Sequence, residues 1–431
     1  MNMFQEFTIK NFRTHRDTTI ELQGVTLLVG SNNSGKTNLL AALQHFSRLI
    51  SHTYVGSEYQ KKHKKSEVKI SSDLRTEARL EPHDYFPHRH RLSEDDPIVF
   101  SCKWKNEYGA VEYELELYAT HKEGREVACK EEIKLKLDKD KNPKEFQSGY
   151  DGIKRSICLP KKLQSVGLNG DEFKLMNWFF NDLGTIFAFN LQSSYLKYGY
   201  RDTEERHDFS KVKIASQLGL EGGNLHKILM HVMQGEPNTY ERFIASLRRF
   251  EASFQGLRIK EGQVSWLFDL GRTPASPDAF PPRVVSDGLL KAAAVALLSS
   301  MYRSPGLIFL EEIENGISQK NIGRFLGWLK QAAGTGYSTA RGYNTQFIIT
   351  SHNPSVLRDF SNELYNVYNI RLERKGFYSI VRNLNSSLKA FVELGTVEGE
   401  IIKEGDKEVV KISPEKLVEL WYSGTIGGEI D

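Results

Sequence analysis

The chain has 431 residues, of which 39% are hydrophobic and 26% are charged, and its formal net charge is +3. This composition is that of a folded globular protein and excludes the disordered and fibrous classes. The small net charge neither requires nor excludes a nucleic-acid partner. The three cysteines lie far apart without a Cys-x-x-Cys pair, which excludes a disulfide framework and a zinc knuckle; they are Cys102, Cys129 and Cys158.

The start of the chain, MNMFQEFTIKNF, carries charges and lacks an apolar stretch of signal-peptide length. The longest apolar run, around residues 292–301, is too short to span a bilayer. We therefore expect a cytoplasmic protein with no membrane partner.

The first fifty residues predict a strand, a turn, a second strand, a loop and a helix. Residues 4–12 alternate in polarity as a strand does, and residues 18–22 form its expected hairpin partner. Residues 25–30 (VTLLVG) predict a buried strand that runs directly into a glycine-rich loop. Residues 37–50 have the apolar spacing of a helix.

Residues 51–97 differ in character, with the basic run KKHKK at 61–65, several prolines and many histidines. We expect an excursion with little core of its own. His83, His88 and His90 could be metal ligands, but no paired cysteine and no His-x₃-His helix supports them. The pattern favours a solvated loop.

The rest of the chain predicts antiparallel strands between 97 and 137 and a mostly helical stretch from 160 to 255. No internal repeat or sustained heptad pattern indicates a coiled-coil arm. The further predicted elements are a strand pair (257–270), a helix (289–302), a strand (306–312), a helix (321–333), a strand (346–352), two short strands (366–373 and 378–383) and a last helix (414–424).

The Gly-x-x-x-x-Gly-Lys-Thr motif at residues 30–37 lies between a predicted strand and a predicted helix. In that setting, backbone N–H groups of the loop and of the helix N-terminus face an anion, and glycines let the anion approach closely. Lys36 would reach the β- and γ-phosphates of a nucleotide, and the Thr37 hydroxyl would bind Mg²⁺. The sequence therefore predicts a phosphate loop.

A buried strand that ends in acidic residues supplies the other half of such a site. In LIFLEE (307–312), Glu311 takes the position of the Mg²⁺-associated carboxylate, and Glu312 that of the base orienting the attacking water. Alone, such a strand end is common and usually solvated. Together with the phosphate loop, it indicates catalysis.

Two further elements follow in order. Ser286-Asp287-Gly288 precedes a helix and lies 26 residues before Glu312, so it is either an ordinary helix N-cap or a second phosphate-binding nest for the nucleotide of a facing copy. His352 ends an apolar strand 40 residues after Glu312, where it could contact the γ-phosphate. All four elements occur in the order that an ABC ATPase needs.

The segments VTLLVGSNNSGKTNLLAAL, VVSDGLLKAAAVALL, LIFLEEIENGIS and FIITSHNPSVL resemble the RecF/SMC/OLD class of ABC ATPases. They are closest to the OLD-like "AAA family" ATPases of bacterial repair and phage-defence operons. The resemblance implies an α/β fold, a bilobed ABC-type P-loop ATPase head with a mixed central sheet, an antiparallel β subdomain and a helical signature lobe. It further implies ATP and Mg²⁺ as cofactors and a homodimer or higher even-numbered oligomer.

The resemblance also assigns residue roles. Glu312, His352 and Lys36 would be catalytic, and Thr37 and Glu311 would hold the metal. Ser286 and Gly288 would act on the nucleotide of the partner protomer. The residues assigned to nucleotide binding are Arg13, Gly30, Asn32, Asn33, Ser34, Gly35, Lys36, Thr37, Asn38, Ser286, Asp287 and Gly288.

The sequence departs from the family pattern at three places near the acidic strand end. Glu311 stands where many relatives have Asp, Ile313 where a Pro is usual, and Ser318 where relatives often have His. The glutamine loop is not placed, because neither Gln60 nor Gln192 fits it. These departures bear on the hydrolysis rate, which we expect to be slow.

The tail segment 395–408 superficially suggests the opening of a TOPRIM nuclease domain. Such a domain needs about a hundred residues and a later Asp-x-Asp, whereas 23 residues without that motif follow Glu408. We therefore expect no intrinsic nuclease.

We divide the chain into an N-terminal half of the ATPase head (1–150), a mainly helical insertion (151–280), a C-terminal half of the head (281–360) and a small α/β extension (361–431). The leading interpretation is an ATPase that acts as a switch or scaffold for a separate effector, which we expect to be a nuclease, in anti-phage defence.

Three alternatives stay open. A RecF-like repair ATPase would clamp DNA directly, using KKHKK and Arg248-Arg249. A transporter subunit is disfavoured by the 250-residue gap between Lys36 and Ser286. A nucleotide-binding structural protein would hydrolyse little ATP.

Overall fold

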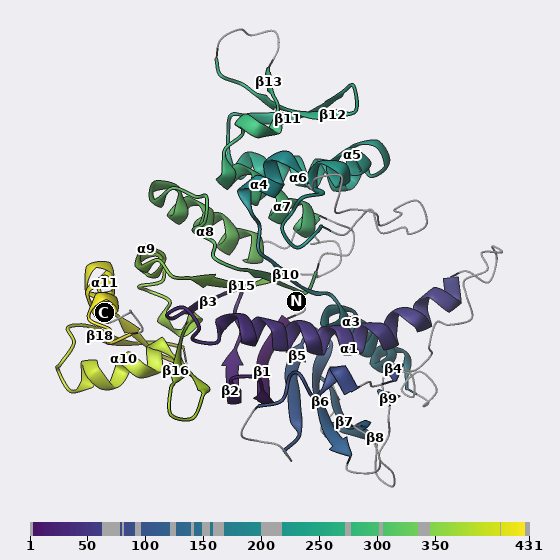
Figure 1. The fold of residues 1–431 in the computed structure, drawn as a ribbon, viewed down its shortest axis with the longest axis vertical. Coiled ribbons are helices and arrows are strands. Elements are labelled where there is room, and N and C mark those ends of the chain that lie inside the picture. The colour runs from purple at the N-terminus through teal and green to yellow at the C-terminus, as the bar shows by residue number, and fades with distance from the viewer. Residues whose placement is uncertain are drawn as a thin grey trace. The chain divides into compact units, whose positions relative to one another are not determined.

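The computed structural model describes residues 3–62, 78–79, 82–90, 96–120, 126–138, 142–148, 156–157, 168–199, 218–271, 277–300, 305–334, 345–405 and 407–426. The chain divides into two compact units. The first unit comprises Met1–Phe187 and Ser361–Asp431, and the second comprises Ala188–Phe360. Helices and strands occur in both, so the fold class is mixed α/β, as predicted (Figure 1).

A six-stranded antiparallel sheet in the first unit has the order β2-β1-β5-β6-β7-β8. Alternate residues of its strands are buried, and Phe100 and Cys102 lie opposite Leu115 and Tyr113. The predicted strands are confirmed, and β8 is an addition. The strands are β1 (Met3–Phe12), β2 (His15–Glu21), β5 (Ile98–Lys105), β6 (Gly109–Thr120), β7 (Glu126–Leu137) and β8 (Lys144–Ser148).

The buried face of this sheet packs against α1 (Lys36–Lys62) and α3 (Gly170–Gly184). Phe46 of α1 stacks on Phe100 and Tyr113, at ring-centroid distances of 5.2 and 5.8 Å. The predicted end of this helix at residue 50 is wrong. No proline interrupts residues 51–62, and the single Gly56 costs a helix only about 1 kcal/mol, so nothing stops α1 there.

Residues 82–90 contradict the expectation of a solvated loop. Backbone hydrogen bonds join Arg13 N to His88 O (2.5 Å) and His90 N to Asn11 O (2.8 Å). The His88 ring stacks on Phe12 with centroids 5.2 Å apart, and His90 is buried. The segment therefore packs against the rings of Phe12 and His45, which its polar sequence did not indicate. Residues 63–65 of the basic run lie outside the described residues.

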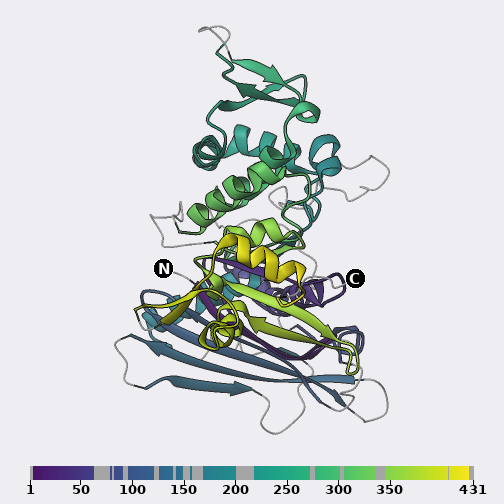
Figure 2. The same cartoon turned by 90° about the vertical axis from the view of Figure 1, so that its left-hand side faces the viewer.

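A second strand group of the first unit leads into the phosphate loop. All of β3 (Val25–Val29) is buried, and it pairs in parallel with β16 (Val367–Glu373), which is antiparallel to β17 (Tyr378–Asn383). Figure 2 shows the C-terminal elements, in yellow and green, beside the blue strands of the same unit. The tail elements are α10 (Leu384–Glu393), β18 (Glu400–Glu404), β19 (Lys407–Lys411) and α11 (Pro414–Tyr422), of which only α11 was predicted.

The second unit contains the parallel pair β14 (Leu307–Leu310) and β15 (Gln346–Ser351), each buried throughout. The helix α7 (Asp287–Ser300) is buried on nearly every side, in agreement with its alanine-rich apolar sequence. The other elements are β10 (Ile186–Phe189), α4 (Ser193–Tyr198), α5 (Leu225–Gly235), α6 (Pro237–Phe250), β11 (Phe254–Lys260), β12 (Gln263–Phe268), β13 (Asp278–Phe280), α8 (Gln319–Gly334) and α9 (Pro354–Arg358). None of the helices in the described part of the chain has the length and apolar character that crossing a membrane requires.

The aromatic stack on the sheet predicts a large stability cost for Phe46→Ala. Phe46 has no exposed area, and its removal leaves a cavity beside Phe100 and Tyr113, so we expect a loss of about 3–5 kcal/mol in unfolding free energy. Phe391→Ala is the control, because this side chain is 39% exposed and should cost less than about 1 kcal/mol. Urea unfolding measures both, and equal costs would contradict the assignment of the core.

Candidate functional site

The predicted phosphate loop connects β3 directly to α1. Its backbone takes left-handed values at Asn33 (φ 61°) and Gly35 (φ 110°), and Gly30 has φ 151°. A Cβ added to Gly30 would lie 2.1 Å from the carbonyl oxygen of Ile370, so no larger residue fits. The loop therefore has the conformation in which backbone N–H groups can gather round an anion at a helix N-terminus.

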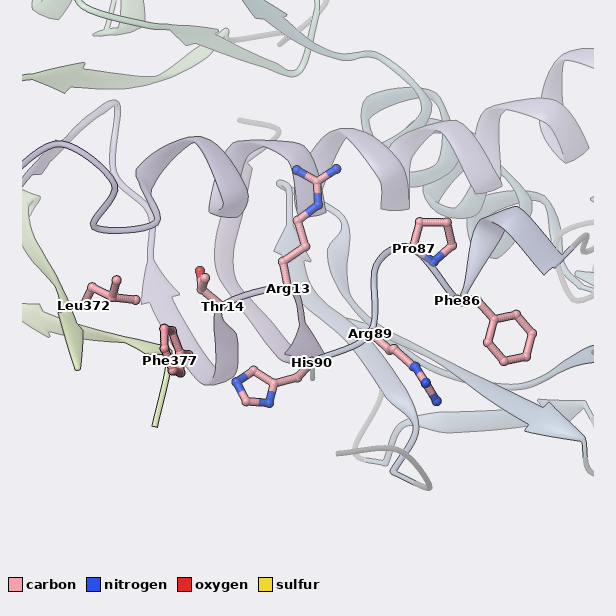
Figure 3. A pocket seen from close by; sticks show the side chains of 8 residues that line it. All are labelled: Arg13, Thr14, Phe86, Pro87, Arg89, His90, Leu372 and Phe377. Carbon is pink, nitrogen blue, oxygen red and sulfur yellow. The ribbon is translucent and has the colours of Figure 1, made fainter. Parts of the chain in front are cut away.

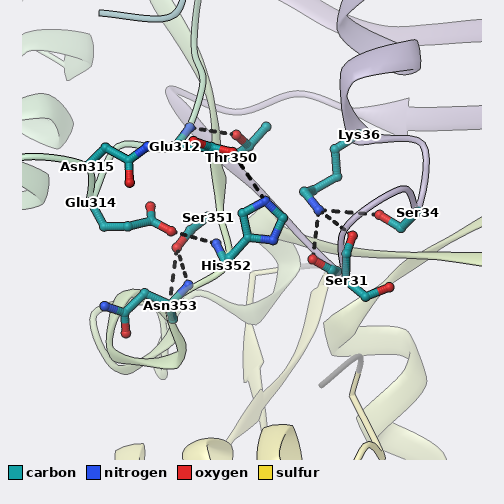
Figure 4. A network of polar contacts seen from close by, with 11 residues as sticks. Ser31, Ser34, Lys36, Glu312, Glu314, Asn315, Thr350, Ser351, His352 and Asn353 are labelled. Carbon is teal, nitrogen blue, oxygen red and sulfur yellow. Dashed lines mark hydrogen bonds and ion pairs between the residues drawn. The ribbon is translucent and has the colours of Figure 1, made fainter. Parts of the chain in front are cut away.

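The Lys36 side chain folds back over this loop. Its ammonium donates to the carbonyls of Gly30 (2.7 Å) and Ser31 (2.8 Å) and to the Ser34 hydroxyl (3.4 Å) (Figure 4). The positive charge is thus held above the loop. The Thr37 hydroxyl is on an exposed residue, where it is accessible to a metal ion.

The loop is supported from behind by residues that the sequence interpretation missed. The Ser379 hydroxyl of β17 donates to Ser34 O (2.7 Å) and contacts Thr14 Oγ1 (2.8 Å). A Cβ on Gly35 would lie 2.0 Å from Ser379 Oγ, so this support and the glycine require each other. No local pattern marks Ser379, because it lies 345 residues from its partner.

His15 is a second support. Its Nε2 lies 3.0 Å from Gly35 O and its Nδ1 3.0 Å from Thr18 Oγ1. Burial lowers the pKa of His15 to about 4, although the hydrogen bond to Gly35 opposes this shift. The ring is therefore neutral near pH 7, donates from Nε2 to the carbonyl and accepts the Thr18 hydroxyl at Nδ1.

Arg13 follows a tight turn in which Asn11 and Arg13 both have positive φ, 56° and 50°. Its guanidinium lies 5.4 Å from the Phe12 ring centroid and donates to Asn38 on the first turn of α1 (3.3 Å). The structure thus brings three predicted residues of the first unit together: Arg13, Asn38 and the loop end at Thr37.

Two cavities of the first unit meet at Arg13. One, of about 710 Å³, is lined by Arg13, Thr14, Phe86, Pro87, Arg89, His90, Leu372 and Phe377 (Figure 3). The other, of about 450 Å³, lies along α1 and includes Gln44, His45, Arg48 and His88. Both contain cationic and aromatic groups, which suit a planar, negatively charged ligand.

In the second unit, the predicted acidic residues follow β14. Glu312 has a left-handed backbone (φ 47°), and its N–H donates to the Thr350 hydroxyl (2.9 Å). Its carboxylate accepts from Asn315 Nδ2 (2.5 Å) and lies 3.7 Å from His352 Nε2 (Figure 4). Glu312 and His352 are thus neighbours at the ends of adjacent strands.

Glu314 was missed by the sequence interpretation. Its Oε1 accepts from the backbone N–H of His352 (2.7 Å), which ties the acidic loop to the end of β15. Its Oε2 is buried and has no hydrogen-bond partner within the described residues. We refer to residues 311–317 as the acidic loop.

Ser286 is the N-cap of α7, since its carbonyl accepts from Leu290 N (3.1 Å) and its hydroxyl from Leu289 N (3.4 Å). Asp287 forms an ion pair with Lys197 of α4 at 2.6 Å. Gly288 differs from the loop glycines, because an added Cβ would meet Ile317 at an ordinary 3.7 Å. Nothing within the described second unit requires glycine there.

Two family models match the sequence. Residues 3–180 match a model described as "AAA ATPase domain". Residues 273–358 match one described as "AAA domain, putative AbiEii toxin, Type IV TA system". The first match includes the phosphate loop, and the second includes Ser286, the acidic loop and His352. Both groups of predicted site residues therefore lie in sequence that is similar to ATPase domains.

Comparison with solved structures finds a likeness to the SMC head domain from Thermotoga maritima, at 13% identity and a TM-score of 0.40. The match covers 88% of this chain and 98% of that one. No functionally curated protein matches the sequence.

The contact between Gly35 and Ser379 predicts that Gly35→Ala damages the phosphate loop. The new Cβ would require a φ that L residues avoid and would displace Ser379, so we expect a loss of at least about 2 kcal/mol and no measurable ATP binding. Gly327→Ala is a matched control in α8, because its Cβ would meet no atom within 4 Å. Gly327→Ala should raise the free energy of unfolding by no more than about 1 kcal/mol and leave the nucleotide affinity unchanged. Isothermal titration and urea unfolding measure both effects.

The lowered pKa of His15 predicts an acid-labile loop. The folded state holds His15 neutral down to about pH 4, whereas the unfolded chain takes up the proton near 6.5, so acid favours unfolding. Stability is full above pH 6.5 and falls towards pH 4, by about 3 kcal/mol for this residue. His15→Gln keeps an N–H donor but does not titrate. Between pH 4 and 6.5, the slope of its unfolding free energy against pH should therefore correspond to about one proton fewer than in the wild type. Parallel curves of unfolding free energy against pH for wild type and variant would refute this.

Proposed function

We propose that the protein binds and hydrolyses ATP with Mg²⁺. The observation that carries this is the presence, in one chain, of a glycine-constrained phosphate loop with Lys36 above it and of an acidic loop in which Glu312 contacts His352. When bound, Mg²⁺ would supply charge neutralisation at the phosphates, with Thr37 and Glu311 as its protein ligands. The accessible Thr37 hydroxyl and the loop glycines fit this group.

The roles of the chain's own residues follow from their contacts. Lys36 would carry its charge from the loop carbonyls to the phosphate oxygens. Glu312, with one oxygen held by Asn315, would orient a water through the other. His352, bonded through its backbone to Glu314, would contact the γ-phosphate with a ring that stays beside Glu312.

We further propose that ATP joins two copies of the chain. Gly288 supports this, because no described atom of its own unit lies close enough to exclude a Cβ there. A glycine that its own fold does not need suits close approach by an outside group. A phosphate held by the facing copy is such a group, and the exposed Ser286 would contact it as well.

The biological role that we propose is a nucleotide-controlled switch for a separate effector protein, with a nuclease as the expected effector, in anti-phage defence. The toxin–antitoxin system named in the second family's description supports a defence setting. ATP would bias the chain between two states, and the effector would be held in one of them.

The alternative is a clamp on DNA, which the sequence suggested through Arg248-Arg249. The contacts of Arg248 weaken this suggestion. Arg248 donates to the carbonyls of Phe254 (3.3 Å) and Gln255 (2.5 Å), so it is occupied in joining α6 to β11. DNA binding that appears only with ATP and weakens with salt would favour the clamp over the switch.

Three variants test the proposed function. Lys36→Ala should abolish ATP binding, and Glu312→Gln should keep binding while reducing hydrolysis by at least about 100-fold. Gly288→Ala should not lower the melting temperature and should leave each protomer's ATP affinity nearly unchanged. It should, however, prevent dimerisation of the Glu312→Gln protein in ATP. Nucleotide titration, phosphate release and light scattering measure these effects. ATP-independent dimers in all variants would refute the dimerisation proposal.

A further inference from the structure

The larger of the two cavities at Arg13, of about 710 Å³, is not used by the proposed ATP hydrolysis. Its walls come from three segments that are remote in the chain: the turn after β1, residues 86–90, and the turn between β16 and β17 (Figure 3). Backbone hydrogen bonds join these segments, from Arg13 N to His88 O (2.5 Å) and from Ser379 N to Thr14 O (2.6 Å). A cavity of this volume, with walls fixed to one another, is typical of a site for a small ligand.

This cavity lies on the carbonyl side of the phosphate loop. Thr14, which lines it, contacts the Ser379 hydroxyl (2.8 Å), and that hydroxyl donates to Ser34 O (2.7 Å). Leu372, another lining residue, is the partner of Ser379 in the strand register. In a trans peptide the C=O and N–H groups point in opposite directions, so the N–H of Gly35 points away from the cavity. A ligand in the cavity is therefore distinct from a phosphate held by the N–H groups of the loop.

An exposed aromatic ring stands on strained backbone at the rim of the cavity. Phe377 is the last residue of the four-residue turn 374–377 and has a left-handed φ of 52°, a conformation that glycine or asparagine adopts at less cost in free energy. Its side chain is 63% exposed, so packing within the chain compensates little of that cost. Strain of this kind is kept where function requires it. An exposed ring beside a cavity offers a surface on which a planar group can stack.

The charge of the cavity is positive. Arg13 and Arg89 line it, and none of the described lining residues is acidic. Burial lowers the pKa of His90, so that ring is neutral near pH 7 and the charge comes from the two arginines. The Arg89 guanidinium lies 5.7 Å from the centroid of the Phe86 ring, which also lines the cavity. Guanidinium groups bind phosphate through paired N–H donors, so the cavity combines an anion site with a stacking surface.

We propose that this cavity binds one nucleotide unit, free or at the end of a strand, with its base against Phe377 and its phosphate at Arg89. Stacking on an exposed ring and paired hydrogen bonds from a guanidinium are the two contacts that recognise such a unit. The site goes beyond the proposed ATP hydrolysis and does not depend on it, because the phosphates of ATP would lie on the N–H side of the phosphate loop.

The first test uses the Lys36→Ala protein, in which the phosphate loop should no longer bind nucleotide. Isothermal titration with AMP, GMP, CMP and UMP should still find about one site per chain for at least one of them. Adding Phe377→Asn or Arg89→Met should weaken that binding by at least about tenfold, since each removes one of the two contacts. Phe391→Ala and Arg258→Met are the matched controls, because both side chains are exposed and neither lines the cavity. They should leave the affinity unchanged.

Further ligands identify the source of the nucleotide. A 5′-phosphorylated hexathymidylate that binds at least about tenfold more tightly than any mononucleotide would assign the site to the end of a strand, and the reverse order would assign it to a free nucleotide. Inorganic phosphate or phenyl phosphate that binds as tightly as the best nucleotide would overturn the proposal. So would the absence of any binding in Lys36→Ala, because the cavity would then serve only ATP held by the loop. Neither result depends on whether the wild type hydrolyses ATP.

The second test separates binding by Phe377 from structural support. Asparagine adopts the left-handed conformation more readily than phenylalanine, so Phe377→Asn should keep or raise the melting temperature while it weakens binding. Phe377→Tyr keeps an aromatic ring and should retain the wild-type affinity to within about threefold. Thermal unfolding and the same titrations measure both variants. A lower melting temperature in Phe377→Asn, or equal losses of affinity in the two variants, would show that the ring is structural and would overturn the proposal.

Discussion

A phosphate loop that turns its N–H groups towards an anion leaves its carbonyl groups to be held by something else, and most of the first unit is arranged around that need. Ser379 holds the carbonyl of Ser34, His15 holds that of Gly35, and the Lys36 ammonium itself holds those of Gly30 and Ser31. These contacts explain why the loop joins segments that are remote in the chain. They also explain why the loop requires Gly30 and Gly35, because a Cβ at either position would clash with Ile370 or Ser379 of the same unit.

The second unit keeps three carboxylates close together in the half-buried acidic loop, namely Glu311, Glu312 and Glu314. Backbone bonds fix the loop through Thr350 and Phe189, Asn315 occupies one oxygen of Glu312, and His352 lies against the other. Negative charge of this density is stable only with cations near it.

The parts predicted from sequence are those whose signals are local. The strand, glycine loop and helix at 25–50 follow one another directly, and the acidic strand end and His352 each adjoin an apolar strand. The supports of the loop could not be predicted, because Ser379 becomes recognisable only when β16 has paired with β3. Residues 82–90 were misjudged because polar histidines gave no sign of stacking on Phe12. The apolar pattern of residues 289–298 predicted the helix α7, but it gave no sign that Lys291 would be buried within it.

The distance along the chain between Ser34 and Ser379 has a consequence for how the protein is made. The phosphate loop leaves the ribosome early, but its carbonyl support lies 345 residues later. At about 5–20 residues per second, that separation corresponds to roughly 20–70 s of synthesis. During this interval the nascent chain contains the phosphate loop but not β16 and β17, which support it. The phosphate loop therefore reaches its full set of carbonyl contacts only after β17 has been synthesised.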